Sequence, residues 1–111
     1  MQESDIMTLA YKMDDALAIC WAAAQGDLQE LQRLIASGVD LNAADYDGRT
    51  GLHLAASEGQ YDIVVLLVNK KVNINCKDRW GGTPLADARR GNHKKTIEFL
   101  EKHGGIVERE G

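Results

Sequence analysis

The chain repeats itself with a period of about 33 residues, and this constrains its fold more than any other feature. The stretch "DYDGRTGLHLAASEG" (45–59) is followed one period later by "DRWGGTPLADARRGN" (78–92). The same step aligns Asp45 with Asp78, Thr50 with Thr83, Leu52 with Leu85, Ala55 with Ala88, and Leu67 with Leu100. Stepping back from the middle copy aligns Ala55 with Ala22, Gly59 with Gly26, and Leu67 with Leu34. A period of this length is typical of stacked repeat proteins, so we expect three units in one small domain.

Each unit is predicted to hold two short helices. In the middle unit, the hydroxyl of Thr50 suits the N-cap of a first helix, and Gly59 suits its end because glycine readily adopts positive φ. A second helix is expected from about Tyr61 to Asn69. The residues predicted to face the core are Leu52, Ala55, Ala56, Ile63, Val64, Leu66 and Leu67. Helices this short are not stable alone in water, so the units must stack.

Two segments with turn chemistry connect the units. "DYDGR" (45–49) and "DRWGG" (78–82) each begin with an aspartate and contain a glycine suited to a tight turn, so each is predicted to project as a hairpin. The predicted parts are an N-terminal extension (1–13) that could form a short helix, a repeat domain (14–105) with units at about 14–44, 45–77 and 78–105, and a frayed tail (106–111).

The repeated segment "RTGLHLAASEGQYDIVVLLV" (49–68) and its period resemble the ankyrin repeat, whose signature includes T-P-L-H-x-A. The resemblance implies an all-α ankyrin repeat solenoid of about three helix-turn-helix units joined by β-hairpin-like turns. Three residues depart from the pattern: Gly51 replaces a proline, and Lys71 and Asn92 replace glycines. Restoring proline at residue 51 is therefore expected to stabilise the fold. The chain further resembles the ankyrin segments of glutaminases and of plant integrin-linked-type kinases.

Composition and charge narrow the class of protein. A net charge of -4 argues against a general affinity for nucleic acid or anionic membranes. No apolar run approaches the roughly 18 residues of a membrane helix, and the N-terminus lacks the plan of a signal peptide. Cys20 and Cys76 share no metal-like spacing, so we interpret them as reduced thiols. We expect a cytoplasmic protein, with the nucleus as the alternative.

The sequence shows no catalytic or cofactor-binding pattern. His53 stands at the histidine of T-P-L-H without a recognisable partner acid, and the resemblance implies that it bonds backbone and threonine groups between neighbouring hairpins. His93 and His103 have no carboxylate or cysteine at metal-ligand spacing. Neither G-x-G-x-x-G nor a Walker lysine occurs. We predict no enzymatic activity, no cofactor and no metal.

The two tryptophans are interpreted differently. Trp21 aligns with Leu54 in a first helix, so it is predicted to pack in the core against the extra N-terminal residues. Trp80 stands at a predicted hairpin tip. One interpretation folds it back over the stack, and the other displays it as an aromatic anchor, because Trp and Arg are enriched at binding hot spots.

The resemblance implies that partners bind the hairpin tips and the exposed side of each first helix. The predicted partner-binding residues are Tyr46, Asp47, Arg49, Ser57, Glu58, Arg79, Trp80, Arg89 and Arg90, with Ala24, Gln25 and Gly82 extending the surface. The favoured function is a non-catalytic protein–protein interaction module. Two alternatives remain: an accessory region of a larger enzyme, such as a glutaminase-like hydrolase or a protein kinase, and a structural module that associates end to end. We expect a monomer unless the last alternative holds.

Charge is distributed unevenly along the chain. Residues 1–68 contain eleven acids and three bases, whereas residues 69–103 contain nine bases and four acids. A solvated surface without a specific partner is one interpretation. The other is an acidic partner drawn to the basic third unit.

Overall fold

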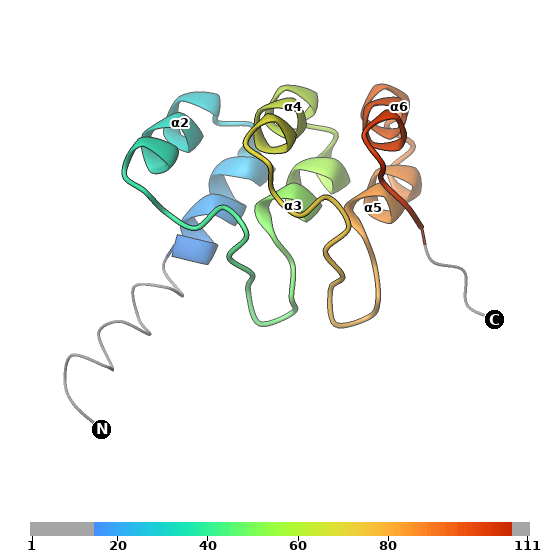
Figure 1. The fold of residues 1–111 in the computed structure, drawn as a ribbon, viewed down its shortest axis with the longest axis horizontal. Coiled ribbons are helices and arrows are strands. Elements are labelled where there is room, and N and C mark those ends of the chain that lie inside the picture. The colour runs from blue at the N-terminus through green and yellow to red at the C-terminus, as the bar shows by residue number, and fades with distance from the viewer. Residues whose placement is uncertain (1–14, 108–111) are drawn as a thin grey trace.

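The computed structural model describes residues 15–107, which form three pairs of antiparallel helices standing side by side (Figure 1). A helix at residues 15–25 pairs with α2 (Leu28–Ala36), α3 (Gly51–Glu58) with α4 (Tyr61–Asn69), and α5 (Pro84–Arg90) with α6 (Lys94–Lys102). The first helices of the pairs form one row and the second helices another, and two loops project beside the first row (Figure 1). Within the described residues, the extended backbone pairing is limited to one bridge, Ala44 with Thr50. The predicted all-α solenoid is confirmed.

Helix ends lie at the residues that the sequence predicted for them. Thr50 caps α3: its hydroxyl accepts the N–H of His53, and the ring Nδ1 of His53 accepts the N–H of Thr50 at 3.1 Å. Thr83 caps α5 in the same way through the N–H of Ala86. Gly59 ends α3 at φ 68°, and the aligned Asn92 adopts φ 57°. Asparagine therefore takes over the left-handed position that glycine occupies one unit earlier.

The core is a continuous layer between the two rows of helices. α3 packs on both α4 and α5, and α4 packs on α6. All but one of the predicted core residues of the middle unit are buried, and Leu66 is half-buried. Gly51 is buried against Ile19 of the preceding unit, and a Cβ at residue 51 would lie 2.6 Å from Ile19 Cγ2. Proline at residue 51 is therefore expected to clash with Ile19, against the expectation from the family pattern that it stabilises the fold.

Three series of hydrogen bonds join successive units in the register of the repeat. From one first helix to the next tip, Cys20 Sγ donates to the carbonyl oxygen of Arg49, and His53 Nε2 donates to that of Gly82. At the start of each second helix, a side chain bonds the first helix of the preceding unit: Gln60 donates to the Ala24 carbonyl and His93 to the Ser57 carbonyl. Between connecting loops, Asn42 accepts the N–H of Asn73, and Asn75 accepts the N–H of Ile106. The repeat thus fixes both the units and the bonds between them.

The predicted C-terminal tail begins within the described residues, whereas the predicted N-terminal extension lies before them. Ile106, assigned by the sequence to a frayed tail, is instead held on the third unit, because its carbonyl oxygen also accepts a hydrogen bond from Thr83 at 2.6 Å. The predicted N-terminal extension (1–13) and the tail beyond residue 107 lie outside the described residues.

Candidate partner-binding face

The two hairpin tips are built alike. The Asp45 carboxylate accepts the N–H groups of Asp47 and Arg49 at 2.9 and 3.0 Å. Asp78 accepts the N–H groups two and four residues later at 2.9 and 2.8 Å. Each aspartate therefore fixes its own turn, and the side chains between are displayed: 85% of Tyr46 is exposed. The tips and the exposed side of the first helices are called the tip face below.

Arg79 ties the two tips together. Its backbone N–H donates to the Asp47 carbonyl oxygen at 2.7 Å, and its guanidinium lies 3.4 Å from the Asp47 carboxylate. The same guanidinium lies 5.3 Å from the centre of the Trp80 ring. The Trp80 ring is 67% exposed, so the structure agrees with the interpretation in which Trp80 is displayed and not folded back over the stack.

Trp21 corrects the sequence analysis. It was predicted to pack in the core, but its side chain is 70% exposed. Leu17, one turn earlier on the same side of the helix at residues 15–25, is 56% exposed. The buried positions of this helix are Ala16, Ile19, Cys20, Ala22 and Ala23, which leaves Leu17 and Trp21 on its exposed side. The prediction failed because the aligned Leu54 is only partly buried, and alignment with a leucine does not by itself mean burial.

The arginines of the predicted site are paired with carboxylates. Asp87, which is buried in α5, lies 3.5 Å from the guanidinium of Arg49 and 3.1 Å from that of Arg90. Arg89 pairs with Glu101 at 2.9 Å. The structure thus brings Arg49 and Arg90 together on one carboxylate, whereas Arg89 points to α6. The long separation of Arg49 and Asp87 in the sequence hid this pairing from pattern analysis.

The other predicted residues lie at the ends of the first helices. Glu58 and Gln25 are exposed at the last turns of α3 and of the helix at residues 15–25, and Ser57 and Ala24 are half-buried beside them. The carbonyl groups of Ser57 and Ala24 already accept hydrogen bonds from the following unit. These positions can therefore offer a partner their exposed side chains and little free backbone.

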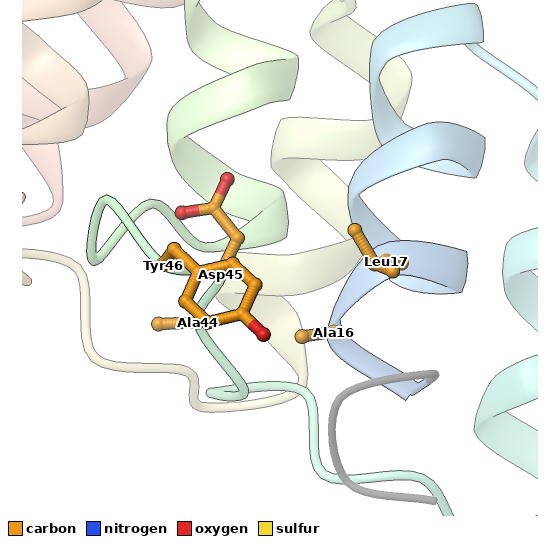
Figure 2. A pocket seen from close by; sticks show the side chains of 5 residues that line it. All are labelled: Ala16, Leu17, Ala44, Asp45 and Tyr46. Atoms are coloured by element: carbon orange, nitrogen blue, oxygen red, sulfur yellow. The ribbon is translucent and has the colours of Figure 1, made fainter. Parts of the chain in front are cut away.

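A small cavity opens where the first tip meets the first unit. It has a volume of about 120 Å³ and is lined by Ala16, Leu17, Ala44, Asp45 and Tyr46. Leu17 and Ala16 lie on the helix across from the Tyr46 ring, which comes from the tip (Figure 2). Tyr46 was predicted from the sequence as a partner-binding residue, whereas Leu17 and Ala16 were not. The i, i+4 spacing of Leu17 and Trp21 was the available signal.

His53 is a structural residue. It is fully buried, and Gly82 O, 2.9 Å from Nε2, can only accept a hydrogen bond. Nε2 therefore carries the proton, which leaves Nδ1 free to accept the Thr50 N–H. Within residues 15–107, no group of three His, Cys, Asp or Glu side chains is placed to hold a metal ion. None of the helices in this range combines the length and apolar character needed to cross a bilayer.

Residues 19–109 match the family profile described as "Ankyrin repeats (3 copies)". The chain belongs to the ankyrin repeat family. Its relatives include serine/threonine-protein kinase 12 of Arabidopsis thaliana, which is 39% identical over 92% of this chain and 22% of the kinase. Potassium channel SKOR of the same plant is 47% identical over 75% of this chain and 10% of the channel. The mitochondrial liver isoform of glutaminase from Rattus norvegicus is 44% identical over 77% of this chain and 14% of the glutaminase.

These relatives confirm the resemblance to ankyrin segments of plant kinases and of glutaminases. Ankyrin repeats are protein-interaction modules on a non-catalytic fold. The chain spans less than a quarter of the length of each of these three relatives. What those whole proteins do therefore does not transfer to this chain directly.

Proposed function

We propose that this ankyrin stack is a non-catalytic module that binds a protein partner through its tip face. The observation that carries the proposal is the display of large apolar side chains at and beside the tips: Leu17, Tyr46 and Trp80 are exposed, and Trp21 is exposed one turn from Leu17. Exposed apolar residues gathered on one face mark interaction sites, and tryptophan and tyrosine are prominent among binding hot spots. The proposed contact residues remain Tyr46, Asp47, Arg49, Ser57, Glu58, Arg79, Trp80, Arg89 and Arg90, to which the structure adds Leu17 and Trp21.

The charge of the partner follows from how the arginines are paired. The pairs of Arg79 with Asp47 and of Arg89 with Glu101 are close to neutral, so they steer a charged partner weakly. Arg49 and Arg90 share the single carboxylate of Asp87, which leaves one net positive charge. We therefore assign the attraction for an acidic group to this pair, between the second and third units.

Charged side chains at the two ends of the stack favour a monomer. Arg89 and Glu101 stand one period after Ala56 and Val68, so an ion pair replaces two apolar residues of the middle unit. At the other end, Glu30 and Arg33 stand one period before Ile63 and Leu66 and pair with each other. Charged outer faces are what terminal repeats need in water. End-to-end self-association would bury both pairs, which argues against it.

A second candidate function is the accessory role. The matched region makes up 22% of the kinase, 10% of the channel and 14% of the glutaminase. Related ankyrin stacks thus accompany unrelated larger proteins, and the tip face of this chain would bind a partner in either setting.

We further propose an intracellular location, because both cysteines are free thiols.

Photo-crosslinking tests the proposal. A photoreactive amino acid replaces Tyr46 or Trp80 in the full chain, and Glu98 on the exposed side of α6 serves as the matched control. We expect a protein adduct from the two tip positions and none from residue 98. Adducts from residue 98 alone would move the site to the second-helix face.

Solution scattering of the same chain should give a monomer mass. Turnover of ATP or glutamine by the purified chain would contradict the non-catalytic assignment.

A further inference from the structure

The cavity between the first unit and the first tip is an apolar site with one charged wall. Among the described residues that line it, Ala16, Leu17, Ala44 and Tyr46 present mostly carbon atoms, and the other is Asp45. Figure 2 shows the Tyr46 ring and the side chains of Ala16 and Leu17 on opposite sides of the opening. The volume of about 120 Å³ is close to that of an apolar cavity of roughly 150 Å³ that binds benzene in another protein. The site therefore has room for one aliphatic or single-ring side chain.

Asp45 is held at this site by the fold. One of its carboxylate oxygens, Oδ1, accepts the N–H groups of both Asp47 and Arg49, so the side chain cannot leave without opening the turn. The pKa of the neighbouring Cys20 thiol is raised mainly by burial and further by the Asp45 charge, while the Arg49 charge opposes this. The first two units also carry a net negative charge, because residues 15–68 contain eight acids and two bases. A ligand group beside the cavity is thus favoured when it is positively charged.

We propose that the cavity receives an apolar side chain of a protein partner, and that this side chain is flanked by a lysine or arginine that pairs with Asp45. The inference rests on the proposed function and states the chemistry of its partner. The part of the partner segment that binds at the first unit would contain this apolar residue and the neighbouring basic residue. Further along the tip face it would meet the net positive charge at Arg49 and Arg90, where an acidic residue fits.

The chain's own N-terminal residues match this site less well. The sequence of residues 1–14 contains Glu3, Asp5 and Asp14 against the single base Lys12. Its net charge has the same sign as Asp45, so charge complementarity favours a basic partner segment over this one.

Selection of peptides against the full chain tests the proposal. A phage-displayed library of random peptides is panned on the immobilised protein, and the enriched sequences are synthesised with and without lysine-to-glutamate reversals. Binding is then measured on the wild type, Leu17→Ser and Asp45→Asn. Leu28→Ser is the matched control for the first variant, because Leu28 is an exposed leucine of the same unit on α2. Asp40→Asn is the control for the second, because Asp40 accepts the N–H of Asn42 in a similar turn away from the cavity.

We expect enriched peptides to share an apolar residue next to a base. Their affinity should fall about tenfold or more with Leu17→Ser and stay unchanged with Leu28→Ser. Asp45→Asn keeps the acceptor oxygen of the turn and should remove the preference for lysine over glutamate, whereas Asp40→Asn should not. Thermal unfolding followed by circular dichroism shows that the variants are folded.

Two results would overturn the inference. Peptides that bind Leu17→Ser as tightly as wild type, or that are enriched in acids beside the apolar residue, would show that the cavity is not the site. If Ile6→Ser with Leu9→Ser raises peptide affinity about tenfold, residues 1–14 compete with the peptide for the cavity, which supports the cavity as the peptide site. The proposed function survives both results as long as crosslinks from Tyr46 or Trp80 to a partner persist, and it fails separately if those crosslinks are absent.

Discussion

Cys20 and His53 occupy the same position in successive units, and each donates a hydrogen bond to the tip of the next unit. Cys20 Sγ lies 3.6 Å from the carbonyl oxygen of Arg49, and His53 Nε2 lies 2.9 Å from that of Gly82. The third residue in this series is Ala86, whose side chain has no donor. The series therefore runs from a weak thiol donor to a strong imidazole donor and then stops at the last unit.

The first prediction is that His53→Ala strongly destabilises the protein. The substitution leaves the Thr50 N–H without its acceptor, and an unsatisfied buried group costs about 1–3 kcal/mol. It also removes one of the two hydrogen bonds to the Gly82 carbonyl, which still accepts the Asp78 N–H. Urea unfolding should show the loss, and amide exchange at Thr50 should become faster. His103→Ala is the control, because the exposed His103 ring interacts locally, with the carbonyl and the ring of Phe99 in the same unit. Equal losses in the two variants would contradict the structural role of His53.

The second prediction concerns the Cys20 thiol at alkaline pH. Burial, with a smaller contribution from the Asp45 charge, raises the pKa of Cys20 from 9.0 to about 11. Because the folded state keeps the proton longer than the unfolded state, this stabilising contribution is complete below pH 9.0 and is lost between pH 9.0 and about 11. The stability advantage of the wild type over Cys20→Ala, measured by urea unfolding, should shrink across this range. A constant difference would show that the thiol does not titrate as described.

The helices and turns could be predicted because short-range residue types determine them. Thr50, Gly59 and Asp45 act through groups close to them in the sequence, so their roles are visible in a single unit. The period of the repeat then carries each role into the neighbouring units. Two features lay beyond this reasoning. The exposure of Trp21 depends on which side of its helix meets α3, and the pairing of Arg49 with Asp87 depends on how two units stack.

The third prediction is that Gly51→Pro and Gly51→Ala destabilise the protein, although proline is the family residue. The new Cβ would meet the buried, β-branched Ile19, and overpacking of this kind costs about 1–3 kcal/mol. Ile19→Ala removes the obstructing methyl group. In a double-mutant cycle measured by urea unfolding, Gly51→Ala should therefore cost much less in the Ile19→Ala background. Strict additivity of the two changes would mean that the clash is not the cause.

The fourth prediction is a gain in stability from Lys71→Gly. Lys71 adopts φ 66°, a left-handed conformation that costs a residue with a side chain about 1–2 kcal/mol, partly offset by the backbone entropy of glycine. Gly38 holds the aligned position of the first unit at φ 85° with open space around it. Gly38→Lys should therefore lose about what Lys71→Gly gains. Melting temperatures that move in the same direction for both variants would contradict this account.

The last prediction separates an anchor from a steering charge in binding of the crosslinked partner. Trp80→Ala removes an exposed ring that Arg79 covers only in part, so it should raise the dissociation rate, at a cost of about 2 kcal/mol if the ring is a hot spot. Arg90→Gln removes half of the cationic pair around Asp87, so it should mainly slow association and reduce its dependence on salt. Arg89→Gln is the comparison variant within the proposed site: Arg89 pairs with Glu101 and points away from Asp87, so it should slow association less. Surface plasmon resonance at two salt concentrations measures both rates. If Arg89→Gln slows association as much as Arg90→Gln does, the shared carboxylate does not set the steering charge, and the basic excess of the third unit acts as a whole.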